Sequence, residues 1–295
     1  MFSKGVTINL DCVLLGPAHP GPENRRISEI PNCVGCGHSG HPVGIQFCPP
    51  TPAQATDDLS KLAKMVPGVS KAKLKSSVQY LAKERHTTYT KELKAVISAI
   101  NKQVAYNKKR RDAAGAMSVG EISPLDFSTP ALSAKWVGDI FVSTLGSQAG
   151  GANFGHAGMY TAKDQILHAP GAGKNARRQD RREVQVGVGT VYMTTSLSVA
   201  SQQVVVDYAI STYEGQAYNY MYYTNKFGDG TKVRVGPAVV NLNPSDRTNC
   251  SELVWGAYKK KGGIDLDGYT AGNGDFFAVF PWDIERSSRT TSYNP

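Results

Sequence analysis

The chain has 295 residues, of which 40% are hydrophobic and 19% are charged, so most of it can bury a core in one or two domains. It contains no run of 18 apolar residues, which excludes a membrane-spanning helix of the usual kind. Its five cysteines are too few, and odd in number, for a secreted disulfide scaffold. The N-terminus has no continuous apolar segment, so we expect no signal peptide and synthesis in the cytoplasm.

Residues 1–54 are rich in Pro, Gly and Cys and predict an irregular lead segment. Cys33 and Cys36 have the C-x₂-C spacing of zinc knuckles, with His41 and Cys48 nearby as further ligands. A second C-x₂-C pair is missing, so two alternatives stay open. These are a reduced segment and a disulfide from Cys48 to Cys33 or Cys36. Apart from this candidate structural zinc, we expect no required cofactor.

Residues 55–117 predict a basic helical segment, because apolar residues recur there at spacings of three and four. Residues 57–112 hold 14 Lys/Arg and 5 Asp/Glu, a difference of +9 that equals the net charge of the whole chain. The stretch "RHTTYT" (85–90) weakens helix propensity in the middle, so one helix and two helices are equally well supported. An anionic membrane or polymer is the partner we expect for this surface, and a merely solubilising face is the alternative. No motif for nucleic-acid recognition accompanies the charge.

Residues 118–295 change to short β-type runs with Gly-rich turns and two helical patterns, which predicts an α+β domain. The expected strands are 138–146, 156–161, 165–170, 184–195 and 276–284, and the expected helices are 201–215 and 251–263.

Cys250 stands at the first turn of the later helix, ahead of its apolar stripe. Unpaired N–H groups and the helix dipole lower the pKa of a thiol at that place, although a small buried residue is the alternative interpretation. A thiolate nucleophile also needs an imidazole. His156 and His168 bracket a predicted hairpin, so both can face one point.

Three motifs in this order resemble the circularly permuted branch of the NlpC/P60 superfamily of papain-like cysteine enzymes, in particular its YiiX/YaeF-like proteins. They are "NFGHAGMYTAKDQILHAPG" (153–171), "NCSELVWGAYKKKGGIDL" (249–266) and "VFPWDIERS" (279–287). The resemblance covers about residues 135–288 and implies a permuted papain-like fold with an antiparallel sheet packed on helices.

The resemblance makes Cys250 the nucleophile, His156 its general base and His168 the third group, which orients the imidazole. Many YiiX-like members have Glu at this third position, whereas His is similar to the main NlpC/P60 branch and to lecithin:retinol acyltransferase-like proteins. Tyr218, in "GQAYNY", is a candidate oxyanion donor. Beyond the resemblance, the loop "KNARRQDRRE" (174–183) offers a basic substrate-binding rim. Its candidates are Arg177, Arg178, Arg181 and Arg182.

Three functions are therefore expected to compete. The first is a cysteine amidase or endopeptidase acting on peptidoglycan-type peptides, and the second is a lipid-directed thiol acyltransferase or esterase. The third is a module that binds a polyanion or membrane without catalysis. An envelope substrate would require export by a dedicated secretion system, as for a toxin or effector with an immunity protein.

Overall fold

The computed structural model describes residues 52–116, 128–146, 152–171, 173–227, 232–235, 238–241, 246–267 and 278–295. The chain divides into two compact units, Met1–Cys48 and Pro49–Pro295, and the described residues all belong to the second. The candidate zinc ligands Cys33, Cys36, His41 and Cys48 lie outside the described residues.

The basic segment forms three helices, which are α1 (Pro52–Met65), α2 (Lys71–Glu84) and α3 (Tyr89–Ala116). The sequence left one helix and two helices equally open, and the structure has a division between Glu84 and Tyr89. A second division at 66–70 was not predicted, although Pro67 and Gly68 signal it. Gly68 has a φ of 83°, which glycine adopts without steric cost, and Ser70 then caps α2 by accepting a hydrogen bond from the Lys73 N–H.

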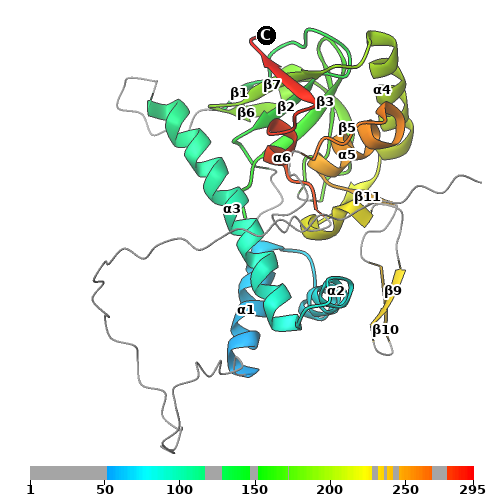
Figure 1. The fold of residues 1–295 in the computed structure, drawn as a ribbon. Coiled ribbons are helices and arrows are strands. Elements are labelled where there is room, and N and C mark those ends of the chain that lie inside the picture. The colour runs from blue at the N-terminus through cyan, green and yellow to red at the C-terminus, as the bar shows by residue number, and fades with distance from the viewer. Residues whose placement is uncertain are drawn as a thin grey trace, which may run out of the picture. The chain divides into compact units, whose positions relative to one another are not determined.

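The predicted α+β class is confirmed: an antiparallel sheet of six strands packs against helices (Figure 1). Its order is β12-β7-β2-β3-β4-β5. The strands are β2 (Ile140–Ser143), β3 (His156–Ala162), β4 (Gln165–His168), β5 (Arg177–Asp180), β7 (Val191–Thr195) and β12 (Thr290–Tyr293). Three further two-stranded ladders pair β1 (Ser128–Pro130) with β6 (Gln185–Gly187), β8 (Ala217–Tyr218) with β11 (Arg247–Thr248), and β9 (Lys232–Val235) with β10 (Ala238–Asn241).

Alternation along the strands separates two cores. In β2, Ile140 and Val142 join the main core beneath the helices, while Phe141 joins a smaller core on the opposite face. The helices that contribute to the main core include α4 (Val199–Tyr213), α5 (Cys250–Ala257) with its π-helical extension η3 (Tyr258–Gly262), and α6 (Pro281–Glu285). Among these, α4 and α5 contact β3, and α6 contacts β2.

The expected strand at 276–284 is wrong where the structure describes it, because residues 281–285 form α6. Pro281 has no N–H to donate to a strand ladder, and its fixed φ suits the first turn of a helix. The Asp283 carboxylate then accepts the Phe280 N–H at 2.8 Å, which closes the helix start. The expected strand at 184–195 is two strands, β6 and β7, separated by a turn in which Gly189 has a φ of 76°.

The helices α1–α3 belong to the same folded unit as the sheet, since their apolar residues continue the main core. A buried polar contact docks α3: Asn107 accepts the Trp282 indole N–H at 3.0 Å and donates to the Thr144 carbonyl at 3.0 Å. Gln103, one turn earlier, donates to Asp283 at 2.8 Å. The lysines of these helices are mostly exposed, so their charge faces outward. Within the described residues, no helix combines the length and apolarity needed to cross a bilayer.

We expect Asn107→Ala to lower the free energy of unfolding by about 3 kcal/mol, because buried donors and acceptors left without partners cost about 1–3 kcal/mol each. Asn101→Ala on the same helix is the matched control. Asn101 is exposed, so its loss should change stability by no more than about 0.5 kcal/mol. Urea unfolding of both variants measures the difference. Equal losses would contradict docking of α3 through Asn107.

Candidate active site

A capping box fixes the start of α5. The Asn249 side chain accepts the Glu252 N–H at 3.0 Å, and Glu252 accepts the Asn249 N–H at 3.3 Å. Asn219 donates to the same Glu252 carboxylate at 3.2 Å. The pattern Asn-x-x-Glu in "NCSE" signals this box, and our reading of the sequence missed it. The box places Cys250 at the first helical position.

Cys250 is completely buried, and burial raises the pKa of its thiol to about 11. Neighbouring backbone N–H groups, first that of Ala157 and then that of Ser251, act in the opposite direction but do not outweigh burial. The expectation that the helix start lowers the pKa of this thiol is therefore wrong for the resting structure. Desolvation outweighs the dipole, and the thiol holds its proton at neutral pH.

The two predicted histidines meet. His156 begins β3, His168 ends β4, and His156 Nε2 lies 2.8 Å from His168 Nδ1. Gly158 leaves the space for this arrangement. A Cβ on that glycine would collide with the Phe141 ring and would lie 3.2 Å from the His168 Cβ. The stretch "HAG" thus supplies His156 and, two residues later, the glycine that leaves room for His168.

Both imidazoles are neutral. Burial lowers the pKa of His168 to about 4, helped by the positive charges of Arg177 and Lys174 and opposed by a hydrogen bond to Gln179. Burial, followed by the repulsion that a protonated His168 would exert, holds the pKa of His156 well below its usual range. At neutral pH the pair is therefore linked through one shared N–H, without a formal charge.

One nitrogen of the pair has no partner. His156 Nδ1 is buried and makes no hydrogen bond in the structure. It does not bond to the Cys250 thiol, which lies beside the backbone N–H of Ala157, the next residue along β3. Because α5 packs on β3, Cys250 and His156 are held on neighbouring segments. Catalytic hydrogen bonds are often absent before substrate binds, so this geometry suits a resting site.

A small pocket of about 100 Å³ opens on the histidines. Its lining comprises Leu145, Gly146, His156, His168, Pro170, Lys174, Arg177, Gln179, Glu183, Val184 and Gln185. Cys250 is not among these residues. The pocket is basic on one side, where Lys174 and Arg177 flank His168.

The four arginines predicted as a rim are divided by the structure. Arg177 lines the pocket, whereas the other three form ion pairs outside it. Arg178 pairs with Glu214 at 2.9 Å, Arg181 with Asp164 at 2.7 Å and Arg182 with Asp180 at 2.7 Å. Gln179 and Glu183 contact Arg177 or each other inside the pocket, and nothing in their spacing had singled them out.

Tyr218, the candidate oxyanion donor, is buried in the short strand β8. In the parallel ladder of β8 and β11, Tyr218 pairs with Thr248, which lies two residues before Cys250. Its ring packs against those of Tyr220 and Tyr222, with centroids 5.1 and 6.1 Å away. The structure thus brings Tyr218 to the segment that leads into Cys250.

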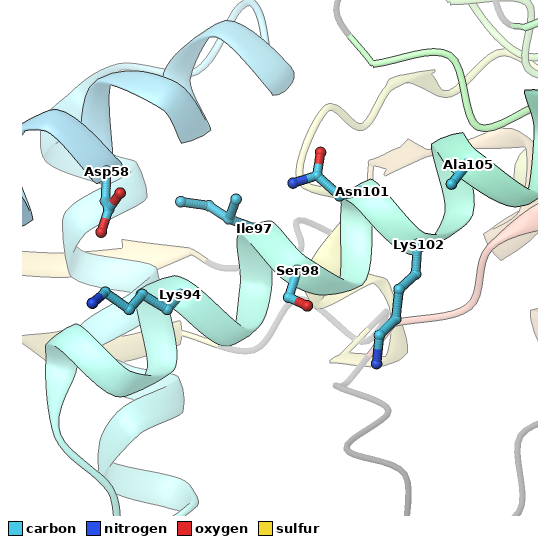
Figure 2. Close-up of a pocket in the computed structure, with 7 residues that line it drawn as sticks. All are labelled: Asp58, Lys94, Ile97, Ser98, Asn101, Lys102 and Ala105. Carbon is cyan, nitrogen blue, oxygen red and sulfur yellow. The ribbon is translucent and has the colours of Figure 1, made fainter. Parts of the chain in front are cut away.

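A larger groove of about 440 Å³ lies on the basic helices (Figure 2). It is lined by Asp58 of α1 and by Lys94, Ile97, Ser98, Asn101, Lys102 and Ala105 of α3. In Figure 2 the Asp58 carboxylate and the Lys94 side chain lie at the same end of the groove. It contains none of the residues predicted for chemistry, so we place the candidate active site at the smaller pocket.

The described ranges hold no group of three or more His, Cys, Asp or Glu side chains arranged to bind a metal ion. In the candidate site, two ring nitrogens of the histidines are already bonded to each other, and His168 Nε2 lies 2.8 Å from Gln179 Oε1. The paired rings as they stand therefore do not fit a metal centre.

No family model matches the chain. An uncharacterized protein of Bacillus subtilis (strain 168), YycO, is 26% identical over 250 residues, which cover 84% of this chain and 91% of YycO. A crystal structure of the metalloprotein YiiX from Escherichia coli O157:H7 (DUF1105) matches with a TM-score of 0.35 and 18% identity. That match covers 54% of this chain and 96% of YiiX. Neither similarity assigns an activity to this chain.

The buried histidines predict a loss of stability in acid. In the unfolded chain the histidines bind protons below about pH 6.5. Native His168, whose pKa is about 4, stays unprotonated until the pH is much lower. The free energy of unfolding should therefore fall as the pH decreases from about 6.5 to 4, by about 3 kcal/mol from His168 alone. Urea unfolding across this pH range measures the slope.

His168→Gln should make that slope shallower. The matched control is His86→Asn, because His86 is exposed and Asn tolerates its positive φ of 50°. The control should keep the slope of the natural protein. If all three proteins share one slope, the histidine pair is not the source of the acid sensitivity.

Proposed function

We propose that this protein is a cysteine hydrolase with a permuted papain-like site, in which Cys250 is the nucleophile and His156 the base. The observation that carries the proposal is the pair of histidines. His168 holds Nε2 of His156, and Nδ1 of His156 stays buried without a hydrogen-bond partner beside the segment that contacts Cys250. The order of the sequence motifs, histidine strand before cysteine helix, supports the same assignment.

In the proposed reaction His156 Nδ1 takes the proton of the Cys250 thiol as sulfur attacks the substrate carbonyl carbon. A neutral resting thiol suits this concerted step, because no buried thiolate has to be maintained between turnovers. The tetrahedral intermediate collapses when His156 gives the proton to the leaving group. Water, deprotonated by the same imidazole, then adds to the acyl carbon. The second intermediate breaks its carbon–sulfur bond and releases the acid, and the Cys250 sulfur takes the proton back from His156, which restores the thiol and the neutral imidazole.

Two donors are proposed for the oxyanion of the intermediate. The N–H of Cys250 lies in the first turn of α5, where backbone N–H groups lack intrahelical acceptors. The hydroxyl of Tyr218 is the second, since its strand runs beside the segment that enters α5. Donors of this kind stabilise negative charge most effectively in a site from which water is excluded.

We propose amides of peptidoglycan-type peptides as the substrates. Lys174 and Arg177 at the pocket give an anionic group of the substrate, such as a peptide carboxylate, a place beside the histidines. The exposed lysines of α1–α3 favour a second candidate, a lipid-directed acyltransferase or esterase that binds anionic membrane. Action as an exported effector, with an immunity protein as partner, belongs to the first candidate.

Incubation with peptidoglycan fragments and, separately, with anionic phospholipid vesicles tests the proposal, with products identified by mass spectrometry. We expect amide cleavage that Cys250→Ala and His156→Ala reduce by at least about a hundredfold, since both variants remove proton transfer or bond formation. His168→Ala should leave more activity, because it removes only an orienting group.

His86→Asn serves as the control for histidine replacement and should keep full turnover. Products from vesicles alone would move the assignment to the lipid-directed enzyme. Unchanged product formation by Cys250→Ala would overturn the proposed nucleophile in both cases.

A further inference from the structure

Behind the two histidines, β5 and the turn that follows it hold a second polar group. His168 Nε2 lies 2.8 Å from the Gln179 side-chain oxygen, Oε1. Arg177 donates its Nε–H to the same oxygen at 2.9 Å. The Gln179 amide nitrogen donates to the Glu183 carboxylate at 3.3 Å. The amide of Gln179 is therefore held at both ends.

The two charged neighbours allow only one orientation of this amide. A guanidinium can only donate hydrogen bonds, and a carboxylate can only accept them. Rotating the amide by half a turn would place its NH₂ group against Arg177 and its oxygen against Glu183. Both contacts would become repulsive. The oxygen of Gln179 therefore faces His168 for a chemical reason.

The orientation determines where the protons sit in the histidine pair. An oxygen at Gln179 accepts, so His168 carries its N–H on Nε2 and leaves Nδ1 bare. A bare Nδ1 on His168 in turn accepts, so His156 carries its N–H on Nε2. The bare nitrogen of His156 is then Nδ1, the buried atom without a partner.

We propose that Arg177 and Glu183, acting through Gln179, are positioning residues that set the tautomers of both histidines and so reserve His156 Nδ1 as the base. This assignment rests on the proposed function for its catalytic meaning, but the tautomers themselves exist without any substrate. Arg177 thereby acquires a role separate from substrate binding, and the "RRQDRRE" stretch is part of the site's support.

Long-range ¹H–¹⁵N NMR of the ¹⁵N-histidine-labelled full chain at pH 7.5 tests the proposal, because it reports which ring nitrogen carries the proton. In the natural protein we expect Nε2–H in both His156 and His168. In Gln179→Leu, which removes the acceptor, His168 should show a mixture of both tautomers, and kcat should fall about tenfold with little change in KM.

Gln179→Glu keeps an acceptor at the same place and should restore Nε2–H in both rings. Gln185→Leu, another glutamine at the same pocket, should leave the tautomers unchanged. A proton on Nδ1 of His156 in the natural protein would overturn the proposal, and so would identical tautomers in Gln179→Leu. Expected tautomers in a protein that cleaves neither substrate class would instead leave the proposal standing and refute the proposed function.

Discussion

The 2.8 Å hydrogen bond between His156 and His168 is the interaction on which the candidate site depends. It joins the first residue of β3 to the last residue of β4, so the ordinary pairing of two neighbouring strands delivers two imidazoles to one end of the sheet. Burial then keeps both rings neutral, and a neutral pair leaves one bare nitrogen. Because Nε2 of His156 is bonded to His168, the bare nitrogen of His156 is Nδ1, on the other side of the ring.

Contacts on three sides support this hydrogen bond. Behind it, the Gln179 amide is fixed between a guanidinium and a carboxylate. In front of it, α5 starts at a capping box that fixes Cys250 beside Ala157. On the flank, Asn107 of α3 donates to the carbonyl of Thr144, which directly follows β2, and to that of Asn153, which lies three residues before β3. The basic helices therefore brace the site as well as carrying charge.

The sequence predicted the parts of the fold whose signals are local. Helix periodicity and short β-type runs with Gly-rich turns predicted the α+β domain, and the hairpin around "AKD" (162–164) brought His156 to His168. Features that depend on long-range packing could not be predicted from the sequence. Burial reverses the expected effect of the helix dipole on Cys250, and residues 281–285 form a helix because Pro281 and Asp283 outweigh the apolar run before them.

The same limit applies to the polar residues. Asn107 and Gln179 are single amides, and their roles depend on partners that only the fold brings near. Trp282 is the partner of Asn107, and His168 is the partner of Gln179. Of the four clustered arginines, the strand β5 takes Arg177 to the pocket and Arg178 to Glu214. Arg181 and Arg182 lie in the short 3₁₀ helix that follows the strand and pair with Asp164 and Asp180. Charge clustering in the sequence could not separate these cases, because it shows neither the alternation that separates Arg177 from Arg178 nor the end of the strand before Arg181.

The central claim is that a neutral Cys250 thiol becomes acylated with His156 as the acceptor of its proton. Rapid acid quenching of the enzyme during turnover of a peptidoglycan-type peptide, followed by mass spectrometry of the digested chain, tests it most directly. The account predicts a transient mass increase equal to the acyl group on the peptide that contains Cys250, and its absence in His156→Ala. Turnover without an adduct on Cys250, or with the adduct on another residue, would contradict it.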